Sequence, residues 1–172
     1  MRGWRLVSGV LAVALVAALV ALGFALGDDD RTAAGSSGEA FALAAAGSQA
    51  EKAARSAVVH MTTYSSTTLA TDFAWADDAG TPKFRTYYSE VSAPIKKLVL
   101  RLGSKAVGSV VDSAPKVQDV DHVTVLLFVD QVITGPDGAD RQLDQPRVTM
   151  SMVRDGDRWL VDEVKLRNLS TG

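Results

Sequence analysis

The stretch that decides the fold of this chain is HVTVLLFVDQVIT, residues 122–134. Two sets of side chains alternate along it, and both are mostly apolar: Val123, Val125, Leu127 and Val129 on one face, Thr124, Leu126, Phe128 and Asp130 on the other. A strand with two apolar faces is typical of the middle of a sheet. The stretch therefore predicts a central strand.

Three further β-rich runs lie around this strand in the sequence, at residues 106–111, 147–154 and 158–166. Gly135-Pro136-Asp137-Gly138 is a turn signal, and Asp155-Gly156 separates the last two runs. An Asp-Gly pair supplies the positive φ angles of a tight hairpin, so the last two runs should pair antiparallel. The C-terminal half is predicted to form an antiparallel sheet of about four strands.

Helical patterns precede the strands. From Ser48 the apolar residues recur at helical spacing, at Ala50, Ala53, Ala54, Ala57, Val58, Met61 and Tyr64. A shorter helix is expected from Leu69 to a stop near Gly80. A third should start with Thr81 as cap and Pro82 in the first helical position, and run to about residue 102. Pro94 predicts a kink or break in it.

Together these patterns predict an α+β fold in which three helices close the concave side of a curved antiparallel sheet. We expect this cone-shaped domain to span residues 48–167, with a C-terminal tail at 168–172. A cone of this kind often has an open end lined by apolar and aromatic groups, where a small hydrophobic molecule fits.

Residues 6–27 form one uncharged apolar run between Arg5 and Asp28. A helix of about 22 residues spans about 33 Å, enough to cross a hydrocarbon core of about 30 Å. The flanking arginines predict a cytoplasmic N-terminus, so residues 1–27 are expected to be a cytoplasmic stub and transmembrane anchor, with the domain outside the cytosol. The alternative is a cleaved secretory signal, although the run exceeds the usual apolar core of about 7 to 15 residues. Residues 28–47, rich in Gly, Ser, Ala and Asp, are predicted to be a flexible tether.

Composition excludes several classes of function. Outside residues 1–27, which hold two arginines and no acid, 16 basic residues stand against 20 acidic ones, a net charge of −4. Nucleic acid is an unsuitable ligand, because binding its backbone requires a basic face. The chain has no cysteine, so disulfides, zinc–thiolate sites and a lipid-modified cysteine are excluded. No metal and no cofactor are expected.

The same cone architecture supports ketosteroid isomerases and dehydratases, which combine a buried acid or base with tyrosine donors. The residues that would supply such a set are Tyr64, Tyr87, Tyr88, Asp72, His60 and His122. Structural roles in the helices and at element ends account for them more simply, and the sequence lacks nucleophile-elbow, phosphate-loop and metal-helix motifs. No catalytic residue is therefore predicted.

Several residue strings, in this order, resemble one family. They are Thr63-Tyr64 with Leu69 and Asp72, Gly80 followed by Phe84 and Tyr88, residues 123–134, and residues 147–164 (RVTMSMVRDGDRWLVDEV). With the apolar run before them they resemble the Mce-associated membrane proteins, accessory proteins of the mammalian-cell-entry lipid importers of actinobacteria. The resemblance implies a cone fold of the nuclear transport factor two-like superfamily. It also implies a non-catalytic role, docking onto importer subunits in the cell envelope and stabilising them, with room for a sterol or fatty acyl group. A structural component of a secretion apparatus, with a similar anchor and fold, is the third alternative.

Two groups of candidate site residues follow. Tyr64, Phe84, Tyr88 and Trp159 are candidates for the wall of a ligand pocket, although core packing is the simpler role for Trp159. Phe73 and Trp75, on the short second helix, are candidates for contact with a partner or with the membrane surface.

Overall fold

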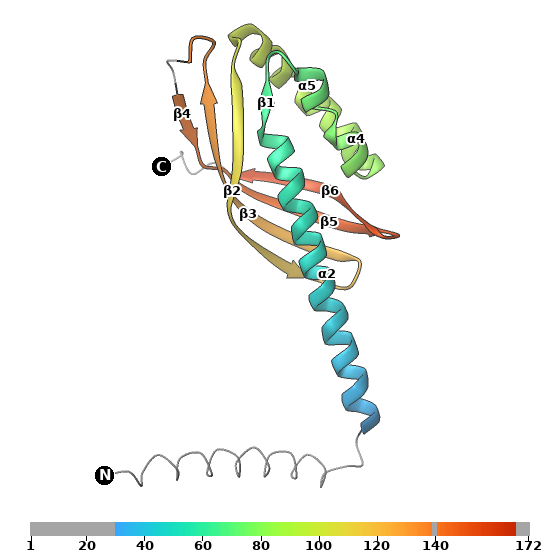
Figure 1. Cartoon of the computed structure of the whole chain (residues 1–172). Coiled ribbons are helices and arrows are strands. Elements are labelled where there is room, and N and C mark those ends of the chain that lie inside the picture. The colour runs from blue at the N-terminus through green and yellow to red at the C-terminus, as the bar shows by residue number, and fades with distance from the viewer. Residues whose placement is uncertain (1–29, 139–140, 168–172) are drawn as a thin grey trace, which may run out of the picture. The chain divides into compact units, whose positions relative to one another are not determined.

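A computed structural model describes residues 30–138 and 141–167 of the chain (Figure 1). The fold is α+β, as predicted, with a curled antiparallel sheet and helices on its concave side. In chain order the elements are α2 (Asp30–Thr62), β1 (Tyr64–Ser65), α3 (Leu69–Asp72), α4 (Trp75–Ala79), α5 (Pro82–Leu102), β2 (Lys105–Val117), β3 (His122–Thr134), β4 (Arg141–Asp144), β5 (Arg147–Asp155) and β6 (Arg158–Arg167).

The sheet has six strands rather than about four, in the order β1-β2-β3-β5-β6, and β4 pairs with β3. All of these pairings are antiparallel. Strand β3 is central, as predicted, because it pairs with β2, β4 and β5. The sequence did not predict β1 and β4, which have two and four residues and are too short to show an alternating pattern.

Strand β2 continues to Val117, six residues beyond its predicted end. A bulge between Val110 and Asp112 interrupts its alternation, and Pro115 lies in its second half. Proline is tolerated there because β1 covers β2 only at Lys105 and Ala106, which leaves the rest of that edge without a paired strand. The hairpin at Asp155-Gly156 forms as predicted, with Gly156 at a φ of 59°.

Helix α2 is longer than predicted. Residues 30–47 belong to it, so the structure differs from the flexible tether expected at 28–47 and from a helix start at Ser48. The physical reason is alanine: the segment is rich in this strong helix former and continues a helix already fixed by packing from Ala46 onward. The compact unit that contains the cone begins at Ala42.

Within that unit α2 lies along β2 (Figure 1). A Cβ atom added to Gly47 would be 2.9 Å from Val117, and one added to Gly108 would be 1.9 Å from the Thr62 hydroxyl. The buried alanines of α2 pack in one core cluster with the inward-facing side chains of the sheet: Val123, Val125, Leu127, Val129, Val148, Met150, Met152 and Val161.

The connection from α2 to β2 also departs from prediction. Helix α2 ends at Thr62, so Tyr64 lies on β1 and not on the helix, and the predicted second helix is two short ones, α3 and α4. Gly80 ends α4, and Thr81 caps α5 by accepting a hydrogen bond from Phe84 N at 3.2 Å, both as predicted. Helix α5 runs through Pro94 without the expected break.

The predicted membrane anchor, residues 6–27, lies outside the described residues. Across residues 30–138 and 141–167, no helix combines the length and hydropathy needed to span a bilayer.

Candidate functional site

A cavity of about 330 Å³ lies between α5 and the sheet. Helix α5 contributes a continuous part of its wall, and the rest comes from the end of α2, β1, the α3–α4 connection, β3, β4 and β6. Most of the lining is apolar or aromatic. The cavity is the size of the smaller ligand sites in proteins, which begin at about 300 Å³.

Aromatic rings form one wall. Tyr88 is at the centre: its ring centroid lies 5.0 Å from Trp75, 5.6 Å from Phe84 and 6.3 Å from Phe73. Phe73 in turn lies 5.6 Å from Tyr64. Offset and edge-on pairs at these distances attract one another beyond the burial of their area. The rings therefore support one another and keep the wall in place.

Two tyrosine hydroxyls on this wall are held in their neutral form. Trp75 Nε1 donates to the Tyr88 hydroxyl at 2.9 Å. Burial raises the pKa of Tyr88 to about 12, even though this hydrogen bond acts in the opposite direction. Burial, followed by the nearby Asp144 carboxylate, also raises the pKa of Tyr64. At neutral pH both groups are hydrogen-bond donors without charge.

Few polar groups reach the cavity, and most are already paired. Gln131 Nε2 donates to the backbone oxygen of Thr62 at 2.8 Å, and the Thr62 hydroxyl donates to Val58 O at 2.6 Å. The fully buried Ser92 hydroxyl donates to Ser89 O at 3.4 Å. Asp144 is the exception: Gln145 N donates to its Oδ1 at 2.9 Å, and among the described residues none donates to its Oδ2. It is the charged side chain among the lining residues.

Three of the four predicted pocket residues, Tyr64, Phe84 and Tyr88, line this cavity. Trp159 does not. It is 8% exposed, packs in the core cluster, and places its Nε1 3.5 Å from Gln49 Oε1 on α2. It packs in the core and also borders a separate hollow together with Gln49 and Arg154.

The two predicted partner-contact residues are buried. Phe73 is 7% exposed and lines the cavity, and Trp75 is 9% exposed and donates to Tyr88. Both rings contact the ring of Tyr88 and so belong to the aromatic wall.

The residues considered for an enzyme do not converge. Of the six, only the three tyrosines line the cavity, and Tyr87 is 53% exposed rather than turned to the sheet. Asp72 accepts from Ser65 N at 2.8 Å and from the Thr68 hydroxyl at 2.6 Å, so it orders the turn before α3. His60 is exposed on α2.

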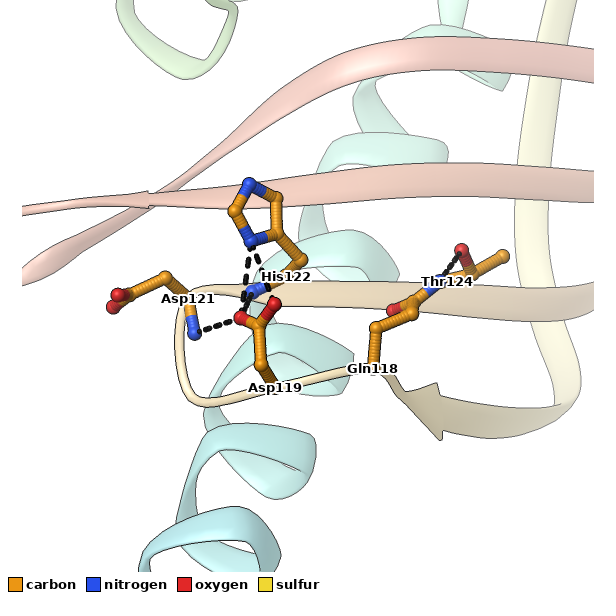
Figure 2. Close-up of polar contacts among 5 residues, drawn as sticks. All are labelled: Gln118, Asp119, Asp121, His122 and Thr124. Atoms are coloured by element: carbon orange, nitrogen blue, oxygen red, sulfur yellow. Dashed lines mark hydrogen bonds and ion pairs between the residues drawn. The ribbon is translucent and has the colours of Figure 1, made fainter.

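His122 is the first residue of β3 and directly follows the turn that joins β2 to β3 (Figure 2). Its Nδ1 is 3.0 Å from Asp119 Oδ1, and the same carboxylate oxygen accepts from the backbone N of Asp121 and of His122 at 2.8 Å. These bonds, that of Asp121 first, lower the pKa of Asp119. These hydrogen bonds stabilise the turn, and neither Asp119 nor His122 lines the cavity.

The sequence prediction missed Gln131, Ser92, Asp144 and Pro146 as parts of the site. Two of them left a signal. Gln131 continues the buried face of β3, at odd positions from Val123 onward, and Ser92 continues the buried face of α5 after Phe84 and Tyr88. A polar residue at an apolar position of a pattern marks a group with a buried partner. Asp144 ends the short strand β4 and Pro146 follows it, and no pattern in the sequence marks either residue as part of the site.

The sequence matches no protein-family model, and no curated protein matches it. Solved structures do share the fold. An IcmL-like type IV secretion system protein of Legionella pneumophila is similar with a TM-score of 0.63 at 11% identity, over 73% of this chain and 94% of that chain. CagV of Helicobacter pylori, a VirB8 homologue, is similar with a TM-score of 0.55 at 14% identity, over 70% and 100%. A TrwG component of a type IV secretion system of Bartonella birtlesii gives 0.52 at 10% identity, over 66% and 86%.

These structures correct the function expected from the resemblance to Mce-associated proteins. All three are components of type IV secretion systems. The expected role in a lipid importer, with importer subunits and a sterol or fatty acyl group as partners, is therefore wrong. The strings that carry the resemblance lie mostly in strands and helix starts of the fold, and a fold by itself does not fix a function.

Proposed function

We propose that this chain is a structural component of a type IV secretion apparatus, anchored in the membrane by residues 6–27, that works by binding other subunits and not by catalysis. The observation that carries the proposal is the shared fold, which extends over 94% of the IcmL-like protein at a TM-score of 0.63. At 11% identity that likeness concerns the fold, so the function needs support from the surface and from experiment.

The surface of α5 supports a binding role. Large apolar side chains recur on it at intervals of three or four residues and are about half exposed: Tyr87 (53%), Val91 (38%), Ile95 (45%), Leu98 (46%) and Leu102 (53%). Residues at this spacing form one stripe along a helix. We call these five residues the α5 stripe. A contiguous exposed apolar stripe is typical of a protein interface. Its contact with water is unfavourable, and that contact is removed when another surface covers the stripe.

Cross-linking in the source organism tests the proposal. The full-length tagged chain should be cross-linked in intact cells, extracted in detergent and purified, and its partners identified by mass spectrometry. We expect type IV secretion subunits. Leu98→Asp should remove most of them, because a charge in the stripe opposes burial. Val120→Asp, in the exposed β2–β3 turn, is the matched control and should retain them.

Recovery of the chain without secretion subunits would contradict the proposal. So would unchanged secretion by the apparatus after deletion of the gene. If secretion subunits are recovered equally with Leu98→Asp, the role stands and the α5 stripe is not the surface that serves it.

A further inference from the structure

We propose that the cavity is an anchor site for a basic side chain, lysine or arginine, presented by a partner polypeptide. The inference concerns the chemistry of the cavity, and it holds whichever apparatus the chain belongs to. Three observations carry it: an aromatic wall, one carboxylate among apolar neighbours, and exposed apolar side chains at the mouth.

The aromatic wall suits a cation. The faces of aromatic rings attract ammonium and guanidinium groups within about 6 Å of the ring centroid. The structure already contains one such contact, because Lys96 Nζ lies 5.2 Å from the centroid of Phe73, a ring that also lines the cavity. Tyr64 and Tyr88 add two further rings to the same wall.

The carboxylate of Asp144 favours a positively charged occupant. Asp144 brings a carboxylate to a lining that is otherwise apolar, aromatic or neutral and polar. Its field reaches the wall, since it contributes to the raised pKa of Tyr64. A positive group entering beside Tyr64 would be stabilised by both the carboxylate and the rings, and a negative group would be opposed by the carboxylate. The positive charge of Lys96 beside Phe73 would weaken this preference without reversing it, because Lys96 does not line the cavity.

The mouth favours a polypeptide over a free amine. Tyr87, Ile95 and Leu166 line the cavity and are 53%, 45% and 57% exposed, and Leu143, next to Asp144, is 58% exposed. A free amine would leave these side chains in water. A segment with apolar residues on either side of the basic one would cover them. Leu166 also lies on β6, the last strand of the sheet order; among the described residues Gly80 and Thr81 bind this strand at Val161, and no strand pairs with its outer edge beside Leu166, where an extended segment could bind.

The isoleucines provide a direct readout. The chain has isoleucine at positions 95 and 133 only, and Ile95 lines the cavity whereas Ile133 does not. Full-length protein with methyl-labelled isoleucine, held in a lipid nanodisc, should be titrated with three acetylated and amidated peptides, Leu-Lys-Leu, Leu-Gln-Leu and Leu-Glu-Leu. We expect the Ile95 methyl signal to move and that of Ile133 to stay nearly fixed. The lysine peptide should bind about fivefold more tightly than the glutamine peptide, and the glutamate peptide most weakly.

Three variants make the test specific. Asp144→Asn should abolish the higher affinity for the lysine peptide and leave the affinity for the glutamine peptide unchanged. Asp155→Asn, in the exposed β5–β6 turn, is the matched control and should retain the advantage. Val91→Trp, at a half-exposed position of the wall, should weaken the binding of all three peptides, because the larger side chain fills the cavity. n-Butylammonium should bind much more weakly than the lysine peptide, because it covers none of the mouth.

Equal affinity for the three peptides, an advantage of lysine that survives in Asp144→Asn, or no movement of the Ile95 signal would each overturn the inference. Tighter binding of n-butylammonium than of the lysine peptide would assign the cavity to a free amine and overturn the polypeptide partner. None of these results depends on which subunits are recovered by cross-linking.

Discussion

The two helices on the concave side of the sheet pack in opposite ways. Helix α2 faces the sheet with alanines at positions 46, 50, 54 and 57, each of which is at most 3% exposed to solvent. Side chains of the strands fill the space beneath them. Helix α5 faces the sheet with Phe84 and Tyr88, whose rings stack on neighbouring rings, and a cavity remains beside them. Small side chains let a helix approach a sheet until no void is left. Large rings that contact one another hold an open space at the end of the same core.

The largest expected effect is in the filled region. Leu127→Ala, at a position with no exposure under α2, should lower the free energy of unfolding by about 2–5 kcal/mol, because the neighbours cannot close the void. Val91→Ala, at the edge of the cavity and 38% exposed, should cost clearly less. Denaturant unfolding of both variants measures the difference. Equal losses would mean that the cavity region is packed as tightly as the α2 region.

A close contact at the end of α2 gives the next effect. A Cβ at Gly108 would lie 1.9 Å from the Thr62 hydroxyl, so Gly108→Ala should lower stability by about 1–3 kcal/mol. Thr62→Gly in the same chain removes the clashing atoms and should recover part of the loss. A double-mutant cycle by thermal unfolding measures the coupling. Strictly additive losses would show that the backbone, and not Thr62, rejects the side chain.

The aromatic wall of the cavity should be sensitive to alkaline pH. Tyr88 has a pKa of about 12 in the fold and about 10 when unfolded. Its contribution to stability is therefore complete below about pH 10 and is lost as the pH rises through about 12. Tyr88→Phe should cost about 1 kcal/mol at neutral pH through the lost bond from Trp75, and the mutant should lose less stability between about pH 10 and 12. Unfolding of the wild type and the mutant at several pH values measures both effects. Stability curves that stay parallel from about pH 10 to 12 would contradict the assignment of the pH effect to Tyr88.

The smallest effect concerns the attachment of α5 to the sheet. Lys83 Nζ and the Thr81 hydroxyl each donate to the Asp162 carboxylate at 2.9 Å, and these bonds, that of Lys83 first, lower the pKa of Asp162. The stability they supply is present above the unfolded pKa of about 4 and is lost as the pH falls through the lower folded value. Asp162→Asn should therefore be less stable than the wild type at neutral pH, with the gap narrowing in acid. Thermal unfolding from about pH 7 to 3 tests this. A gap that does not change with pH would assign the effect to packing.

Local signals in the sequence identified most of the elements. The alternation of residues 123–129 predicted a central strand, Asp155-Gly156 predicted the hairpin, and Thr81-Pro82 predicted the start of α5. Each is a short-range effect: burial alternates with the pleat, glycine adopts the positive φ of the turn, and a threonine oxygen accepts the first free N–H of the helix. The same kind of signal failed at two places: α5 continues through Pro94 without a break, because the rest of the helix is held by packing, and residues 30–47 are helical because their alanines extend a helix already fixed by packing.

The amino-acid sequence by itself determined the class of the fold, the central strand, the turns and the tyrosines and phenylalanine that line the cavity, because each depends on residues close together along the chain. Tertiary structure alone decided that Asp144 on β4 and Tyr64 on β1 line one cavity, that Phe73 and Trp75 turn inward, and that this cavity remains where α5 meets the sheet. These features depend on contacts between separate elements, from 13 residues apart for Trp75 and Tyr88 upward, and on the size of the side chains that meet there. No periodicity in the sequence records either quantity.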